Sequence, residues 1–113
     1  MDTYDNNVLC SASYYNKKYY FNEVYDALPQ AIKDELKIMC VLYTEEVGGV
    51  IIVEFDEEDG SLMLKTTAAE DDLLYDEIGA GLKLNELRIK KRELFEALET
   101  YYKVFFLYED MED

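Results

Sequence analysis

The segment 50–55, Val-Ile-Ile-Val-Glu-Phe, is apolar and β-branched, and a second strand-like segment, 62–67, follows it after an acidic connection. β-Branched and apolar residues favour strands because their side chains pack well on a pleated surface. The Asp59-Gly60 pair near the end of the connection is typical of a hairpin turn. The pattern predicts a β-hairpin in the middle of the chain, and the other elements must be arranged around it.

Two shorter segments at the start of the chain, 8–12 and 18–21, also predict strands. The second is Lys-Tyr-Tyr-Phe, and aromatic residues are enriched in strands. Between them, Asn16 is the residue best suited to supply a turn, because asparagine tolerates the left-handed conformation.

The next segment predicts a helix that begins at Leu28-Pro29 and ends before Gly48-Gly49. Its apolar residues, from Ile32 to Val47, recur mainly at intervals of three and four, as on one face of a helix. Proline suits the first helical position, and glycine suits the left-handed conformation that ends many helices. The stretch 38–43 is apolar on all sides and would also suit a buried strand, but the unbroken stripe favours the helix.

The C-terminal part of the chain predicts two more helices. Leu73, Leu74, Ile78 and Leu82 mark a short one, which glycines at positions 79 and 81 would loosen. A long one is predicted from Leu84 to about Phe106, on an apolar stripe in which Lys91 is the one charged member. Residues 108–113 form an acidic tail that we expect to be frayed.

The predicted order β-β-α-β-β-α-α indicates an α+β fold. We expect a four-stranded, mostly antiparallel sheet with the helices gathered on one face. The chain of 113 residues contains no repeat and no linker, so residues 1–113 are predicted to form a single domain.

Charge and one missing residue type exclude several functions. The chain has 26 acidic against 11 basic residues, a net charge of −15, and no histidine. Such a charge opposes binding to nucleic acid or to an anionic membrane surface, because phosphate contacts need lysine and arginine. Without histidine, the chain lacks the commonest general base and the commonest metal ligand. We therefore expect no cofactor, no nucleic-acid partner and no membrane partner.

The remaining chemical signals are weak. The run from Asp56 to Gly60 places its glycine one position too early for a calcium-binding EF-hand loop. Glu93, Glu96 and Glu99 drift round a helix at steps of three and have no histidine beside them, so no metal site is predicted there. The chain shows no secretion signal, and its longest apolar stretch is too short to span a bilayer, so a cytoplasmic location is expected.

The two cysteines, Cys10 and Cys40, do not form a CxxC pair. We expect them to remain reduced as small residues of the core. No catalytic residues are predicted, and we expect the chain not to be an enzyme.

Five stretches of the chain carry a family resemblance: 18–22, 32–36, 40–49, 74–79 and 91–102. With these stretches the whole chain resembles an uncharacterised family of small acidic bacterial proteins. The resemblance covers about residues 8–107, and no activity is associated with that family, so it assigns no functional residues. It implies a single bacterial cytoplasmic domain.

Three functions remain in competition. The first is a non-catalytic interaction or adaptor module that self-associates; the second is an acidic inhibitor, immunity-type protein or nucleic-acid mimic; the third is a small enzyme that uses carboxylates. A mimic needs a row of carboxylates on one face, whereas an adaptor needs an exposed apolar or aromatic patch.

We favour the first function and predict a homodimer through the C-terminal helix. Residues 83–92 contain five basic residues and one acidic residue, and residues 93–99 contain three acidic residues. Two such helices crossing antiparallel would set the basic part of each against the acidic part of the other, while aromatic residues at a projecting end would be buried. The predicted interaction surface comprises Arg88, Lys91, Arg92, Glu93, Glu96, Tyr101, Tyr102, Phe105 and Phe106.

Overall fold

The computed structural model describes residues 7–107. The predicted frayed tail at 108–113 therefore lies outside the described residues. Along the chain the elements are β1 (Val8–Ser13), β2 (Lys18–Phe21), the 3₁₀ turn η1 (Glu23–Tyr25), α1 (Gln30–Val47), β3 (Val50–Phe55), β4 (Leu62–Thr67), α2 (Glu77–Lys90) and α3 (Arg92–Phe105).

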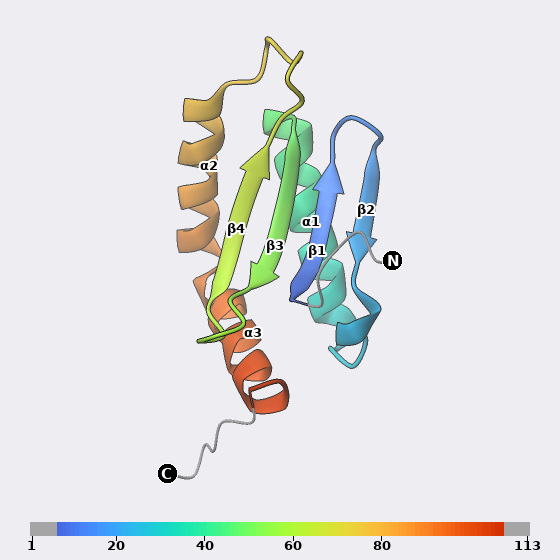
Figure 1. Cartoon of the computed structure of the whole chain (residues 1–113), viewed down its shortest axis with the longest axis vertical. Helices are drawn as coiled ribbons and strands as arrows, with labels where there is room; N and C mark the ends of the chain where they lie inside the picture. The colour runs from blue at the N-terminus through green and yellow to red at the C-terminus, as the bar shows by residue number, and fades with distance from the viewer. Residues whose placement is uncertain (1–6, 108–113) are drawn as a thin grey trace.

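The four strands form one open antiparallel sheet in the order β2-β1-β3-β4 (Figure 1). The predicted hairpin is confirmed, since Val50 pairs with Thr67 and Phe55 with Leu62. The N-terminal strands are confirmed too, but their turn differs: the residue in the left-handed conformation is Lys17, with φ 55°, and not Asn16. The predicted α+β architecture is the observed one.

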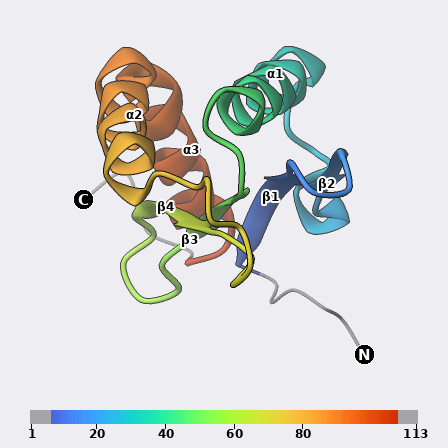
Figure 2. The same ribbon diagram turned by 90° about the horizontal axis from the view of Figure 1, so that it is seen from above.

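All three helices lie on one side of the sheet (Figure 2). Alternation along β3 explains this, because Ile51, Val53 and Phe55 are fully buried while their neighbours are only partly covered. Helix α1 packs against β1 and β3, and α3 packs against the edge strand β4. Helix α1 thus covers the part of the sheet face formed by β1 and β3, and α3 covers the part formed by β4.

Helix α1 contains the stretch 38–43, so the helical interpretation of that stretch is confirmed. Pro29 stands one residue before the helix and not at its first position. At the other end Gly48 has φ 79° and donates its N–H to the carbonyl of Thr44. Glycine is suited to this position because a side chain would be strained at positive φ.

The prediction of one long helix from Leu84 to Phe106 is wrong. The chain bends at Lys91, whose φ of −106° and ψ of 24° lie outside the helical range, and α2 ends there as α3 begins. The backbone N–H of Lys91 still bonds to the carbonyl of Leu87, and that of Phe95 bonds to Lys91. Some of the helical backbone hydrogen bonds are therefore kept across the bend, while α2 and α3 can pack in different directions.

The predicted short helix at Leu73 and Leu74 is also wrong. Both residues lie in turns before α2 and are almost fully exposed. Backbone hydrogen bonds from Asp72 to Ala69 and from Tyr75 to Asp72 close local turns in this segment. Helix α2 starts at Glu77 and replaces both the short helix and the first part of the long one.

Candidate interaction groove

An open groove of about 840 Å³ runs between α1 and α2. Apolar side chains form its floor: Ile38 and Leu42 lie one turn apart on α1, and Leu87 contributes from α2. Ile38 and Leu42 are 59% and 62% exposed, a large fraction for aliphatic residues on a well-formed helix. Exposed apolar groups that gather in one place mark a contact surface more often than scattered ones.

Two ion pairs cross the groove, one near each end. Lys83 Nζ lies 2.8 Å from Glu46 Oε2, and Lys91 Nζ lies 3.0 Å from Glu35 Oε2. In both pairs the acid comes from α1, while the base comes from α2 at Lys83 and from the bend after α2 at Lys91. The hydrogen bond to Glu46, helped by a second carboxylate at Glu86, raises the pKa of Lys83. The rims therefore carry opposite charge, acidic along α1 and basic along α2.

Tyr43 connects the two helices beneath the groove. Its buried hydroxyl donates a hydrogen bond of 2.7 Å to the backbone carbonyl of Ala80 in α2. Burial raises the pKa of Tyr43 to about 12, so the hydroxyl keeps its proton and its role as donor. A buried polar tie of this kind fixes the spacing of α1 and α2 and hence the width of the groove.

A second hollow of about 660 Å³ continues the groove toward α3. It shares Glu35, Lys90 and Lys91 with the groove and adds Arg92 and Glu93 at the start of α3. Three residues of the predicted interaction surface, Lys91, Arg92 and Glu93, therefore line one end of this continuous surface. Arg88 and Glu96 are exposed but line neither hollow.

The aromatic residues predicted to project from the C-terminal helix lie mainly against their own protein. The Tyr102 ring is buried and stacks on Phe55, with ring centroids 4.4 Å apart. The ring centroid of Phe106 lies 5.1 Å from that of Tyr25. Tyr101 is partly covered, so only Phe105 remains exposed. The prediction assumed one straight helix, whereas the chain bends at Lys91 and α3 crosses the start of β4, where Glu99 accepts a hydrogen bond from the N–H of Leu62 (Figure 1).

The sequence analysis did not identify Ile38 and Leu42 as surface residues. A signal was present, since the stretch 38–43 is apolar on all sides while the helix it belongs to can bury only one face. The stretch is therefore more apolar than its own core contacts require.

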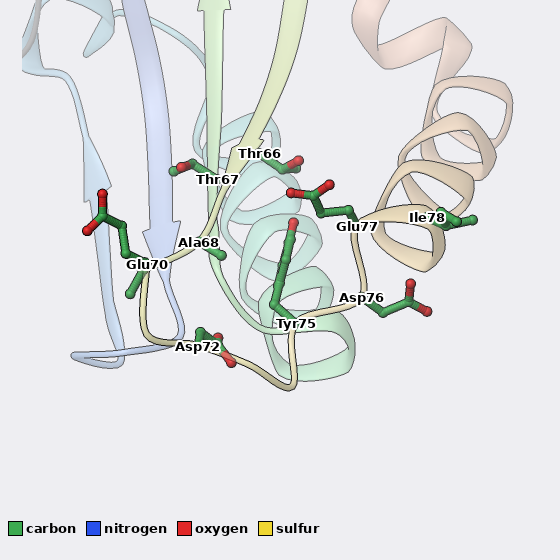
Figure 3. Close-up of a pocket in the computed structure, with 10 residues that line it drawn as sticks. Thr66, Thr67, Ala68, Glu70, Asp72, Tyr75, Asp76, Glu77 and Ile78 are labelled. Atoms are coloured by element: carbon green, nitrogen blue, oxygen red, sulfur yellow. The ribbon is translucent and has the colours of Figure 1, made fainter.

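A third pocket, of about 720 Å³, lies at the loop between β4 and α2 and is lined by acidic residues (Figure 3). Their carboxylates diverge: Glu77 turns toward Thr66, Asp76 points outward, and Glu70 lies on the far side of the loop. Among residues 7–107 no group of three or more acidic or cysteine side chains is placed to hold a metal ion. The hydroxyl of Tyr15 donates to Asp72 at 2.6 Å, which ties the β1–β2 turn to this loop.

Cys10 and Cys40 are buried and free, as core residues, in agreement with the sequence analysis. Their sulfur atoms are 3.9 Å apart, between β1 and α1. The contact with Cys10, together with burial, raises the pKa of the Cys40 thiol well above its ordinary value. A thiol in this state is a poor nucleophile.

The protein is thus a small α+β domain with an apolar groove between α1 and α2, and charged residues line the rims of this groove. No helix in the described part of the chain is both long and apolar enough to cross a membrane. The chain belongs to a family of unknown function, DUF6145, whose match covers residues 6–110. No curated protein and no solved structure is significantly similar to it.

Proposed function

We propose that this protein is a non-catalytic interaction module that binds a segment of a partner protein in the α1–α2 groove. The observation that carries the proposal is the exposure of Ile38 and Leu42 on a helix that is otherwise well packed. Leaving two aliphatic side chains in water costs roughly 1.5–3 kcal/mol each relative to burial. A partner that covers them recovers this free energy.

The rims specify the partner's chemistry. An amphipathic helix laid in the groove would bury its apolar stripe on Ile38 and Leu42, the usual mode of helix-in-groove recognition. Acidic groups along α1 favour basic residues on the side of the bound helix that faces α1. Lys83 and Lys91 favour acidic residues on its opposite side.

The alternatives have less support. The two densest carboxylate runs, 56–59 and 70–72, lie in the connections at opposite ends of β4 (Figure 1), whereas a nucleic-acid mimic needs its charges in one row. For an enzyme that uses carboxylates, acidic groups must converge on one substrate atom, and those in Figure 3 point in different directions.

The proposal is tested by affinity capture of the tagged full chain from lysate of its native host, with quantitative identification of the bound proteins. The amount of a specific partner captured by the Ile38→Glu/Leu42→Glu variant should fall at least about tenfold, since the substitutions place charge on the apolar floor. Val24→Glu is the matched control, because Val24 is an exposed aliphatic residue away from the groove. Equal capture by the groove variant and the control would show that the groove is not the binding site.

A further inference from the structure

Helix α2 has two apolar faces, and only one of them is covered. Ala80 and Leu84 are buried, Ala80 beside Tyr43 of α1 and Leu84 in the hydrophobic core. Ile78, Leu82 and Ile89 have exposures of 77%, 63% and 68%, and none of them lines the α1–α2 groove, although Ile89 also lines the hollow that continues it toward α3. Because successive helical residues are about 100° apart, these three side chains fall within about 40° of one another. We call them the outer stripe.

The outer stripe belongs to the most apolar exposed region among residues 7–107. Five of the twelve large hydrophobic residues that are exposed lie between positions 73 and 89, including Leu73 and Leu74 just before the helix. A surface helix of a monomer normally buries its single apolar stripe and leaves the opposite face polar. A second stripe on the opposite face indicates that a further surface packs against it.

Charge along α2 identifies that surface. The helix is acidic where it starts, at Asp76 and Glu77, and basic where it ends, at Arg88 and Lys90. Such a helix is complementary to a reversed copy of itself, because each acidic start then meets a basic end and the helix dipoles oppose one another. Glu77 and Arg88 are eleven residues apart, so they lie on the same flank of the stripe, about 20° apart.

We propose that α2 pairs antiparallel with α2 of a second copy of this chain through the outer stripe. With the two-fold axis midway between Ile78 and Ile89, these two residues face each other across the interface, and Glu77 of each copy approaches Arg88 of the other. Gly81 lies on the same flank, where a side chain would meet no atom of its own chain. The absence of a side chain there allows the second helix to approach closely.

This inference deepens the proposed function, because it names a second copy as one protein partner. It uses the face of α2 opposite the buried Ala80 and Leu84, whereas the α1–α2 groove uses the face that carries Lys83 and Leu87. Each proposal can therefore fail without the other. It also differs from the α3 homodimer predicted from the sequence, which needed a straight helix through Lys91.

The mass of the full chain is measured by light scattering after size exclusion, at about 10–100 μM. The wild type should elute at twice the 13.3 kDa chain mass. Leu82→Glu/Ile89→Glu should be monomeric with an unchanged circular dichroism spectrum, because both positions are exposed. The groove variant Ile38→Glu/Leu42→Glu is the matched control and should remain dimeric.

Charge exchange tests the antiparallel arrangement. Glu77→Arg alone and Arg88→Glu alone should each weaken the dimer about threefold to tenfold, as expected for exposed charge pairs that occur twice in a symmetric interface. The double exchange should restore it.

The inference would be overturned by a wild type that is still monomeric at about 100 μM, the highest concentration measured. It would also be overturned by a dimer that survives Leu82→Glu/Ile89→Glu. A dimer lost only in Phe105→Asp would place the interface on α3. Failure of the double exchange to restore the dimer would overturn the antiparallel pairing.

Discussion

Helices α2 and α3 follow one another in the chain and have the same length of 14 residues, yet they are used in opposite ways. Helix α3 buries Leu94, Phe95, Leu98 and Tyr102. Helix α2 buries only Ala80 and Leu84 and leaves three large aliphatic residues in water. The difference shows that α3 completes the core, whereas α2 contributes little to it and keeps most of its apolar side chains at the surface.

The contacts that hold the two helices in place differ accordingly. The aromatic ring of Tyr102 stacks on Phe55, and Glu99 accepts a hydrogen bond of 2.7 Å from the backbone N–H of Leu62 at the start of β4. Helix α2 is attached by the hydrogen bond from Tyr43 and by the ion pairs of Lys83, midway along the helix, and of Lys91, directly after it. Buried apolar area stabilises far more than exposed ion pairs do, so α3 contributes most of the stability of this half.

The largest expected effect separates the two helices directly. Leu98→Ala in α3 should lower the free energy of unfolding by about 3 kcal/mol, because it opens a cavity at a fully buried site. Leu82→Ala in α2 should change it by less than about 0.5 kcal/mol. Both are measured by urea denaturation at low protein concentration, where self-association does not contribute. Equal losses would mean that α2 and α3 share the same structural role.

A second prediction concerns the core beneath α1. Cys40→Ala should cost about 1–2 kcal/mol through a small cavity at a buried position. It should leave both the mass in solution and the capture of partners unchanged, because the buried thiol faces Cys10 in the core and does not line the groove. Loss of binding in a variant that denatures like the wild type would show that Cys40 has a function beyond packing.

The hydroxyl of Tyr43 makes a buried hydrogen bond between α1 and α2. Tyr43→Phe removes its hydrogen bond to Ala80 and should cost about 1 kcal/mol. The loss should appear as faster amide hydrogen exchange in α2 than in α3, because α2 has fewer other attachments. If exchange rose equally in both helices, the two would form one cooperative unit.

The same residue gives a pH dependence. Burial raises the pKa of Tyr43 to about 12 from an ordinary value of 10.0, so above pH 10 the unfolded chain loses a proton that the folded chain keeps. The contribution of Tyr43 to stability is therefore complete below pH 10 and is lost as the pH rises toward 12. Tyr43→Phe should reduce the slope of stability against pH in this range without abolishing it, since burial also raises the pKa of Tyr25.

Much of the fold follows from sequence because its signals are local. The hairpin at 50–55 and 62–67 was predicted with its boundaries, since β-branched residues and the Asp59-Gly60 turn all favour the same structure. The helix break could not be predicted in the same way, because no glycine or proline marks it. Its one trace was Lys91, the charged member of an apolar stripe, which the structure shows reaching Glu35 on α1.

The candidate surfaces were harder to predict than the fold. Apolar residues at helical spacing predict that a helix has an apolar face, but not whether that face meets the sheet or the solvent. Ile78 and Leu82 predicted only a helix in this segment, and their exposures of 77% and 63% show that they face outward while Leu84 is buried. The position of Tyr102 against Phe55 likewise depends on the direction of α3 after the bend.

The smallest expected effect concerns Lys91, at the junction of the two helices. Its ion pair with Glu35 is partly exposed, so Lys91→Ala should cost only about 0.5 kcal/mol in dilute buffer. In about 1 M salt the difference should nearly disappear, because charges near the surface are screened. Glu35→Ala should cost the same amount, and the double variant should cost no more than either, since removing one partner already removes the interaction. A loss above about 2 kcal/mol, retained in high salt, would mean that the Lys91 side chain holds the bend by packing and that the separate roles of α2 and α3 depend on it.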